Sequence, residues 1–264
     1  MDQNGGASQF DDEAIVRALA GTRFDRVDFR ATTGSTNDDA LELLGDPSSA
    51  GLTICADFQT DGAGRKAGRR WIAPPGSSLL VTTILAGTIP ATQLWAVPFW
   101  AGICAYEAIE DAAGVAPRLR WPNDVLLGGK KCAGILCTSR ISGEAARAGC
   151  GIGINVIRPA QSHDLEGIDA AFLSDHAPAI SRDQLLITLL KTYHAYWPLL
   201  QRPLELVAAW ELRAHLAGET YRLRLDESAE EFTAAGLRLG PDGTLVVHHA
   251  GAERVVTLAD ATVI

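Results

Sequence analysis

The sequence predicts an α+β fold, in which a large domain of mixed strands and helices is followed by a small all-β domain. Strand-like and helical segments alternate irregularly up to about residue 217, without the repeating strand–helix–strand units of a parallel α/β sheet. After Gly218 only short strand-like segments follow, at close and even spacing. A chain of 264 residues, 47% hydrophobic and 21% charged, is long enough and apolar enough for both domains.

Hydrophobic periodicity and flanking residues predict the elements of the large domain. The polar, acidic residues 1–13 are expected to form a flexible tail, so this domain covers 14–217. Ser35 or Thr36, and later Ser181, can cap helices. The predicted helices are 36–44, 99–113, 182–197 and 204–216. The predicted strands are 52–58, 79–86, 118–121, 124–127, 132–139 and 148–156.

The small domain, 218–264, is expected to be a β-barrel. Its predicted strands are 221–225, 232–239, 244–249 and 254–258. The tripeptide 241–243, Pro-Asp-Gly, is a hairpin turn signal between two of them. Short strands in such close succession are typical of a small barrel.

The composition excludes several classes of function. A net charge of −9 and a pI near 5.1 leave no overall basic surface for nucleic acid, so an anionic substrate would need a local cationic patch. The sequence contains no run of 18 apolar residues, so no membrane span is predicted. The N-terminus lacks the features of a secretory signal. The five scattered cysteines have no metal-ligand spacing, which predicts reduced thiols in a cytoplasmic protein.

Segment 59–71 combines three glycines with four cations. Glycines let a backbone approach an anion, and the side chains of Arg65, Lys66, Arg69 and Arg70 can neutralise phosphates or a carboxylate. The segment is neither a P-loop, because the Gly-Lys-Ser/Thr ending is absent, nor a dinucleotide fingerprint, because no helix follows. An anion-binding loop and a plain basic hairpin both remain open.

Three further segments each allow a functional and a structural interpretation. In 120–136 a Gly-Gly turn joins two apolar strands, and Lys131 begins the return strand, where it could enter a cleft or face solvent. The alternating glycines of 151–156 leave room for a flat ligand or allow tight strand packing. The polar triplet 35–37 could bind a small polar ligand or only cap a helix.

In this order and spacing, the four segments resemble those of the biotin–protein ligases, over about residues 30–264. The run 121–124, Trp-Pro-Asn-Asp, followed by Lys131 and Gly134-Ile-Leu, is similar to the most specific signature of that family. The resemblance implies the fold shared with class II aminoacyl-tRNA synthetases, a mixed and mostly antiparallel sheet flanked by helices. It also implies an SH3-like C-terminal barrel.

The resemblance further implies a two-step reaction with ATP and biotin as substrates and Mg²⁺ bound with ATP. Biotin and ATP would give biotinyl-5′-adenylate, from which biotin passes to a lysine of a biotin carboxyl carrier domain. Lys131 would bridge the biotin carboxylate and the α-phosphate. A compact ammonium suits that task, and lysine is rare in this chain, which has only four.

The site residues are carried over from the family position by position. Those implied for biotin are Ser35, Thr36, Asn37, Gln59, Gly62, Lys131, Gly134 and Gly153. Those implied for ATP and the adenylate are Ala63, Gly64, Arg65, Lys66, Arg69, Trp71, Asn123 and Asn155. Ala63 stands where the family usually has its first loop arginine, and the loop is one residue longer than usual. Asn123 and Asn155 are candidates for the nucleotide side or for Mg²⁺, while Asp124 is interpreted as structural.

Other interpretations remain. A lipoate–protein ligase shares the adenylation chemistry, but its Arg-Arg-x-Ser-Gly-Gly-Gly-like run is absent. An octanoyltransferase would need a nucleophilic cysteine, and Cys132 and Cys137 lie in an apolar segment. A non-catalytic biotin or nucleotide sensor is the third alternative. About 30 residues precede the matched region and the chain is acidic, so no DNA-binding domain is expected. No membrane partner is expected either, because no run of 18 apolar residues occurs. The family resemblance allows a homodimer.

Overall fold

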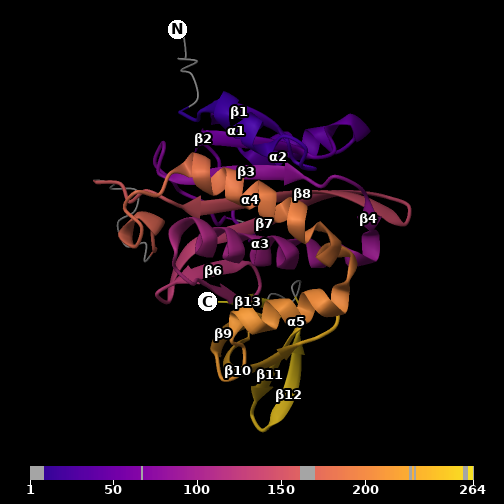
Figure 1. Cartoon of the computed structure of the whole chain (residues 1–264). Coiled ribbons are helices and arrows are strands. Elements are labelled where there is room, and N and C mark those ends of the chain that lie inside the picture. The colour runs from indigo at the N-terminus through magenta and orange to yellow at the C-terminus, as the bar shows by residue number, and fades with distance from the viewer. Residues whose placement is uncertain are drawn as a thin grey trace.

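The computed structural model describes residues 9–66, 68–160, 170–225, 228, 230–257 and 261–263, which contain two sheets (Figure 1). The large sheet has the order β1-β2-β3-β8-β7-β6-β5, and β4 pairs with β8. Its strands are β1 Arg26–Thr33, β2 Leu52–Gln59, β3 Ser78–Ile84, β4 Ile89–Pro90, β5 Arg118–Arg120, β6 Asp124–Leu127, β7 Lys130–Ser142 and β8 Ala145–Asn155. Only β1 and β2 pair in parallel among these described strands, so the sheet is mixed and mostly antiparallel.

Helices cover the two faces of this sheet unequally. One face carries α1 Asp12–Leu19, α3 Ala96–Ala113 and α4 Arg182–Tyr196, which lie in front of the strands in Figure 1. The other face is covered by α2 Thr36–Leu43, which packs on β2, β3, β7 and β8. Short 3₁₀ turns lie at Pro47–Ser49, Ala91–Gln93, Leu173–Asp175 and Trp197–Gln201. Because α2 is short, part of this second face stays open for a ligand.

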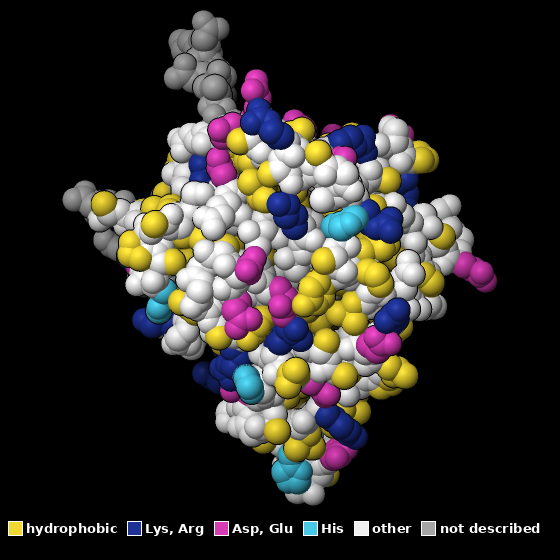
Figure 2. Space-filling view, in the orientation of Figure 1, with side chains coloured by type: hydrophobic (Ala, Val, Ile, Leu, Met, Phe, Trp, Pro, Cys, Tyr) yellow, Lys and Arg dark blue, Asp and Glu magenta, His cyan; other side chains and the backbone are white. Residues whose placement is uncertain are grey.

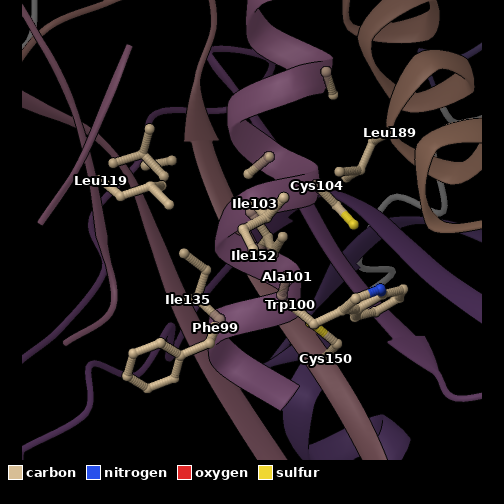
Figure 3. Close-up of a cluster of buried hydrophobic side chains, with 14 of the residues drawn as sticks. Phe99, Trp100, Ala101, Ile103, Cys104, Leu119, Ile135, Cys150, Ile152 and Leu189 are labelled. Carbon is tan, nitrogen blue, oxygen red and sulfur yellow. The ribbon is translucent and has the colours of Figure 1, made fainter. Parts of the chain in front are cut away.

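The main core lies between α3 and the large sheet (Figure 3). Phe99, Trp100 and Ile103 of α3 are fully buried, and Ile135 and Ile152 project from β7 and β8 toward the helix. The Trp100 ring stacks on that of Tyr193 of α4, with centroids 4.5 Å apart. Burial of such large apolar side chains contributes about 1.5–3 kcal/mol each, so this layer makes the sheet a rigid support for its other face.

A second, antiparallel sheet has the order β12-β11-β10-β9-β13 and lies at the C-terminal end (Figure 1). Its strands are β9 Thr220–Leu225, β10 Glu231–Leu239, β11 Leu245–His249, β12 Ala252–Val256 and β13 Ala261–Val263. The helix α5, Pro203–Ala214, packs against both α3 and β5. The Trp121 indole Nε1 donates to the Gly243 carbonyl at 3.0 Å, and an Arg118–Glu219 ion pair lies nearby. These contacts fix the small sheet beside β5 and β6.

The predicted fold class is confirmed, and the predicted helices and strands match observed elements within a few residues. Helix α5 ends at Ala214, two residues earlier than expected, because His215 takes a left-handed conformation with φ 50°. Ser35 precedes α2 as expected, but its side chain makes no capping hydrogen bond. The division into domains near Ala217, which falls between α5 and β9, stays a prediction.

The N-terminal part differs from expectation. Residues 1–8 of the expected tail lie outside the described residues, but Phe10 is only 7% exposed and α1 begins at Asp12. A buried ion pair holds this segment down, since Arg182 Nη2 lies 2.7 Å from Asp57 Oδ1 and the Gln9 N–H donates to Asp57 Oδ2 at 2.7 Å. Four of the described helices and strands were not predicted from the sequence: α1, β1, β4 and β13.

The surface carries charges of both signs. On the helical face, basic, acidic and hydrophobic side chains are interspersed and form no large area of one sign (Figure 2). No described helix is long and apolar enough to cross a membrane. A cationic binding site is therefore expected on the opposite face of the sheet.

Candidate active site

Two adjoining cavities lie on the open face of the large sheet, beside the N-terminus of α2. The smaller has a volume of about 60 Å³, the larger about 410 Å³, and both are bordered by the loop after β2 and by the β6–β7 hairpin. Lining the smaller are Ser35, Thr36, Asn37, Gln59, Ala63, Gly64, Arg65, Trp71, Asn123, Lys131, Gly134 and Gly153, among others. Lining the larger are Gly64, Arg65, Lys66, Arg69, Trp71, Asn123, Lys131 and Asn155, among others. The structure thus brings together all the site residues singled out in the sequence except Gly62.

Hydrogen bonds between α2 and β2 form the polar end of the smaller cavity. The Oε1 of Gln59 accepts from the Thr36 backbone N–H at 2.8 Å and from the Thr36 hydroxyl at 2.9 Å. Because the carbonyl end of this amide is engaged, its NH₂ end is left as a donor. The Ser35 and Thr36 side chains are buried here, so polar groups are concentrated where a small polar ring could bind.

Three glycines on β7 and β8 leave space that other side chains occupy. A Cβ at Gly151 would lie 2.4 Å from Asn37 Oδ1, so this glycine makes room for the Asn37 side chain. A Cβ at Gly153 would lie 2.6 Å from Trp71 Cε2, and one at Gly134 would lie 3.1 Å from both Trp71 Cζ3 and Lys131 Nζ. The Trp71 indole therefore covers a flat floor made by Gly134 and Gly153.

Lys131 lies where the two cavities meet. It is at the start of β7, after the turn of Gly128 and Gly129, which take φ values of 58° and 81° that favour glycine. Its Nζ is 2.6 Å from Asp124 Oδ1, across the β6–β7 hairpin, and 5.6 Å from the centre of the Trp71 ring. The side chain is 40% exposed, so its ammonium is held in place by Asp124 but can be reached by a ligand.

The loop between β2 and β3 is a hairpin that closes over the cavities. Ala63 and Arg70 form an isolated antiparallel bridge, and the Trp71 N–H donates to the Gly62 carbonyl at 2.9 Å. Arg70 is turned toward the loop base, where its Nη2 donates to the Thr60 carbonyl at 2.7 Å and pairs with Asp61 at 3.1 Å. The segment is thus a basic hairpin that borders both cavities, and anion binding by it stays a prediction. Gly62 forms its base.

Asn123 and Asn155 both border the larger cavity, but each uses its amide NH₂ inside the protein. Asn123 donates to the Ile135 carbonyl at 2.7 Å, and Asn155 donates to the Ala171 carbonyl at 3.2 Å. For each side chain this leaves the amide oxygen as the group for a ligand, although Asn155 Oδ1 also accepts from Ser78 at 3.4 Å.

Sequence reasoning missed several residues around the cavities. Leu80 of β3 lines the smaller one, while Pro122, Phe172 and Val263 line the larger one. Thr82 of β3 lies beneath Thr36 and Asn37 and is fully buried. Pro122 belongs to the 121–124 run, but no motif marks Leu80 and Thr82, which the pairing of β3 with β8 brings to the site.

The known proteins that this chain resembles point to one family. Residues 30–155, which contain most of the site, match the sequence pattern of the biotin/lipoate A/B protein ligase family. The bifunctional ligase/repressor BirA of Bacillus subtilis is 30% identical over 220 residues, which is 81% of this chain and 66% of that protein. The biotin–[acetyl-CoA-carboxylase] ligase of Paracoccus denitrificans is 42% identical over 132 residues, which is 48% of this chain and 52% of that protein.

Among solved structures, the biotin protein ligase of Aquifex aeolicus in complex with biotin and ATP has the same fold. Its TM-score is 0.72 at 23% identity, and the match covers 90% of this chain and 98% of that one. The alignments span about two thirds of the Bacillus protein and about half of the Paracoccus protein. Because its sequence, its fold and its site all match, this chain belongs to the biotin/lipoate A/B protein ligase family.

Proposed function

We propose that this protein is an ATP-dependent biotin–protein ligase. The observation that carries the proposal is the ammonium of Lys131, held at the junction of a small polar-ended cavity and a larger cavity bordered by cations. A carboxylic acid in the first and a nucleotide in the second would meet at this group. The Paracoccus protein named above, a biotin–[acetyl-CoA-carboxylase] ligase, supports the choice of biotin as the acid.

In the first step, a carboxylate oxygen of biotin attacks the α-phosphorus of ATP. A bond from that oxygen to phosphorus forms, the bond to the bridging oxygen breaks, and pyrophosphate leaves with the electron pair. Two unit negative charges 4 Å apart repel by about 4 kcal/mol at an effective dielectric constant of about 20. Lys131 offsets this repulsion, and the fixed position of its Nζ favours the charge that develops during transfer.

Asp124 acts on this step through Lys131. Without a ligand its carboxylate binds the ammonium at 2.6 Å, which keeps the flexible lysine side chain near the floor formed by Gly134. When two anions bind, the ammonium can turn from Asp124 toward them. Asp124 is thus a positioning residue that prevents the lysine from moving out into solvent.

The polar end of the smaller cavity suits the cyclic urea of biotin. A ureido ring offers two N–H donors and one carbonyl acceptor. The NH₂ of Gln59 and the hydroxyl of Ser35 can meet these groups, while the floor of Gly134 and Gly153 accepts the apolar chain. Trp71 covers this floor without ligand, so it must shift to admit that chain.

In the second step, the unprotonated amine of an acceptor lysine attacks the carbonyl carbon of the adenylate. A carbon–nitrogen bond forms, the bond to the phosphate oxygen breaks, and AMP leaves, so no covalent enzyme intermediate is needed. Until the acceptor arrives, the 62–71 hairpin excludes water from the mixed anhydride. The expected acceptor is a biotin carboxyl carrier domain.

Three finer points belong to the same proposal. Mg²⁺ would enter with ATP and neutralise phosphate charge, held mainly by phosphate oxygens and water. Asp124 is the only carboxylate among the residues found to line the larger cavity, and it is the side chain that could add a protein ligand to Mg²⁺.

The five cysteines are free thiols, which favours a cytoplasmic location. A homodimer remains an expectation from the family.

The thiols near the site argue against acyl transfer through cysteine. Cys132 is fully buried, and burial raises the pKa of its thiol to about 12. A hydrogen bond that the Cys137 thiol makes to Cys150, together with burial, also raises the pKa of Cys137. Neither can supply a thiolate at neutral pH, as an octanoyltransferase would require.

The test is pyrophosphate release from the purified protein with ATP and radiolabelled biotin, followed by isolation of the adenylate. We expect release that depends on biotin and is weak with lipoate, and transfer of label to a biotin carboxyl carrier domain. Biotin binding without release would identify a sensor instead. Preferential release with lipoate would identify a lipoate ligase.

A substitution at Gly153 tests the position of the biotin chain. In Gly153→Val the new side chain meets Trp71 from the first atom onward, since a Cβ already lies 2.6 Å from Cε2. We expect biotin binding measured by calorimetry to weaken at least about 100-fold, while ATP binding changes little. As a control, Gly87→Ala between β3 and β4 brings its Cβ only to an ordinary contact, 3.9 Å from Trp197, and lies outside both cavities. Biotin affinity equal in the two variants would contradict the assignment.

A further inference from the structure

A buried hydroxyl on β3 orients the polar end of the smaller cavity without reaching the ligand. Thr82 is fully buried, and it is not among the residues that line either cavity. Its Oγ1 lies 2.9 Å from Thr36 Oγ1 and 3.2 Å from Asn37 Oδ1. Thr82 therefore contacts two residues at the N-terminus of α2 from the strand on which this helix packs.

The direction of the hydrogen bonds follows from the number of protons. Gln59 Oε1 can only accept, so the single proton of the Thr36 hydroxyl is donated to it at 2.9 Å. Thr36 Oγ1 can then accept from the Thr82 hydroxyl at 2.9 Å, which is the shorter of the two contacts of that hydroxyl, since Asn37 Oδ1 lies at 3.2 Å. The result is a directed chain from Thr82 to Thr36 to the carbonyl of Gln59.

This chain decides which end of the Gln59 amide faces the cavity. With the carbonyl held by the Thr36 hydroxyl and backbone N–H, the NH₂ end points away, close to Gly62, where a Cβ would lie 3.0 Å from Nε2. Without the Thr82 donor, the acceptor side of the Thr36 hydroxyl is vacant and can accept from the NH₂ of a flipped Gln59 amide. Only the Thr36 backbone N–H then opposes the flip.

We propose that Thr82 is a positioning residue that sets the donor end of Gln59 toward the ureido carbonyl of biotin. The inference rests on the proposed function, since it concerns how the same cavity selects its acid. Thr82 acts through Thr36 and touches no substrate. Its removal should impair recognition of the carbonyl in the ring and leave the nucleotide side unaffected.

The same strand offers a matched control. Thr83 is also fully buried, and its Oγ1 lies 3.0 Å from Thr53 Oγ1. Adjacent strand residues face opposite sides of a sheet, so Thr83 points away from the cavity. Thr83→Val therefore removes one buried hydroxyl of the same kind from the same strand, with no link to Gln59.

The experiment measures biotin binding by calorimetry for the wild type, Thr82→Val, Thr82→Ser and Thr83→Val. It also measures binding of the diamine analogue of biotin, which lacks the ureido carbonyl. For Thr82→Val we expect the biotin Kd to rise about tenfold, as for loss of a buried hydrogen bond. The preference for biotin over the diamine should fall by a similar factor, while the KM for ATP stays within about twofold. Thr82→Ser should recover affinity to within about threefold, and Thr83→Val should stay within about twofold of wild type.

The role of Thr82 would be overturned if Thr82→Val and Thr83→Val changed the biotin Kd equally, or if Thr82→Val left the preference for biotin over the diamine unchanged. Either result would leave the ligase proposal intact. Failure of Thr82→Ser to recover affinity would also overturn the role of Thr82. A wild-type protein that releases no pyrophosphate with biotin and ATP would refute the proposed function and this inference together.

Discussion

Replacing Lys131 with alanine is expected to lower the rate of biotinyl-adenylate formation by about 100- to 1000-fold, the usual loss when one fixed electrostatic group is removed from a transferring centre. The ammonium lies where the two cavities meet, 2.6 Å from Asp124. In Lys131→Ala the two anions lose the cation between them, and Asp124 adds a third negative charge nearby. Biotin-dependent pyrophosphate release in single-turnover experiments measures the effect.

Two variants separate charge from position. Lys130→Ala removes the preceding lysine, which lies outside both cavities, and should retain near wild-type release. Lys131→Arg keeps the positive charge but replaces a compact ammonium with a larger planar group that does not fit between Gly134 and Trp71. We expect Lys131→Arg to remain strongly impaired. Near wild-type release by Lys131→Ala, with its fold intact by circular dichroism, would refute the catalytic role of this lysine.

The second large effect is expected at Arg65, which lines both cavities on the hairpin that covers them. Arg65→Gly removes a cation that can hold the phosphate of the adenylate, and hydrogen bonds to charged groups contribute about 1.5–3 kcal/mol. We therefore expect the adenylate to dissociate about ten to one hundred times faster. Because a free mixed anhydride reacts with any amine, lysines of an added bystander protein should become biotinylated.

Arg70→Gly is the matched control for Arg65→Gly, because it introduces the same flexibility into the same hairpin. The Arg70 guanidinium is engaged by Asp61 and the Thr60 carbonyl at the loop base. Its loss should raise bystander labelling much less than Arg65→Gly does. Equal labelling by the two variants would mean that loop stiffness, and not the Arg65 charge, retains the adenylate.

Much of this site could be predicted from the sequence, because its parts are local in the chain. Gly128 and Gly129 define a hairpin turn, and the turn fixes where Lys131 begins the return strand. The glycines of β8 alternate with apolar residues, so they had to share one face of a strand. Short-range rules of this kind also gave α2, α3 and α4 within a few residues.

Other elements carried no such signal. The strand β1 lies at the edge of the large sheet and mixes charged with apolar residues, several of them partly exposed, so its sequence lacks the apolar run of a central strand. The helix α1 begins inside the polar, acidic segment 1–13, which the sequence predicts to be a tail. It is held by Arg182 and Asp57, which come from α4 and β2 and are far apart in sequence.

By itself, the sequence determined the class of fold, most of its elements in their order, and many of the glycines, cations and polar residues that line the two cavities. The tertiary structure alone decided how they act together. It placed Asp124 on the ammonium of Lys131, laid Trp71 over the floor made by Gly134 and Gly153, and put Thr82 under Thr36. These relations depend on which strands pair and on which face each side chain lies. Pairing is set by the free energy of packing the whole sheet against its helices, which no local segment contains.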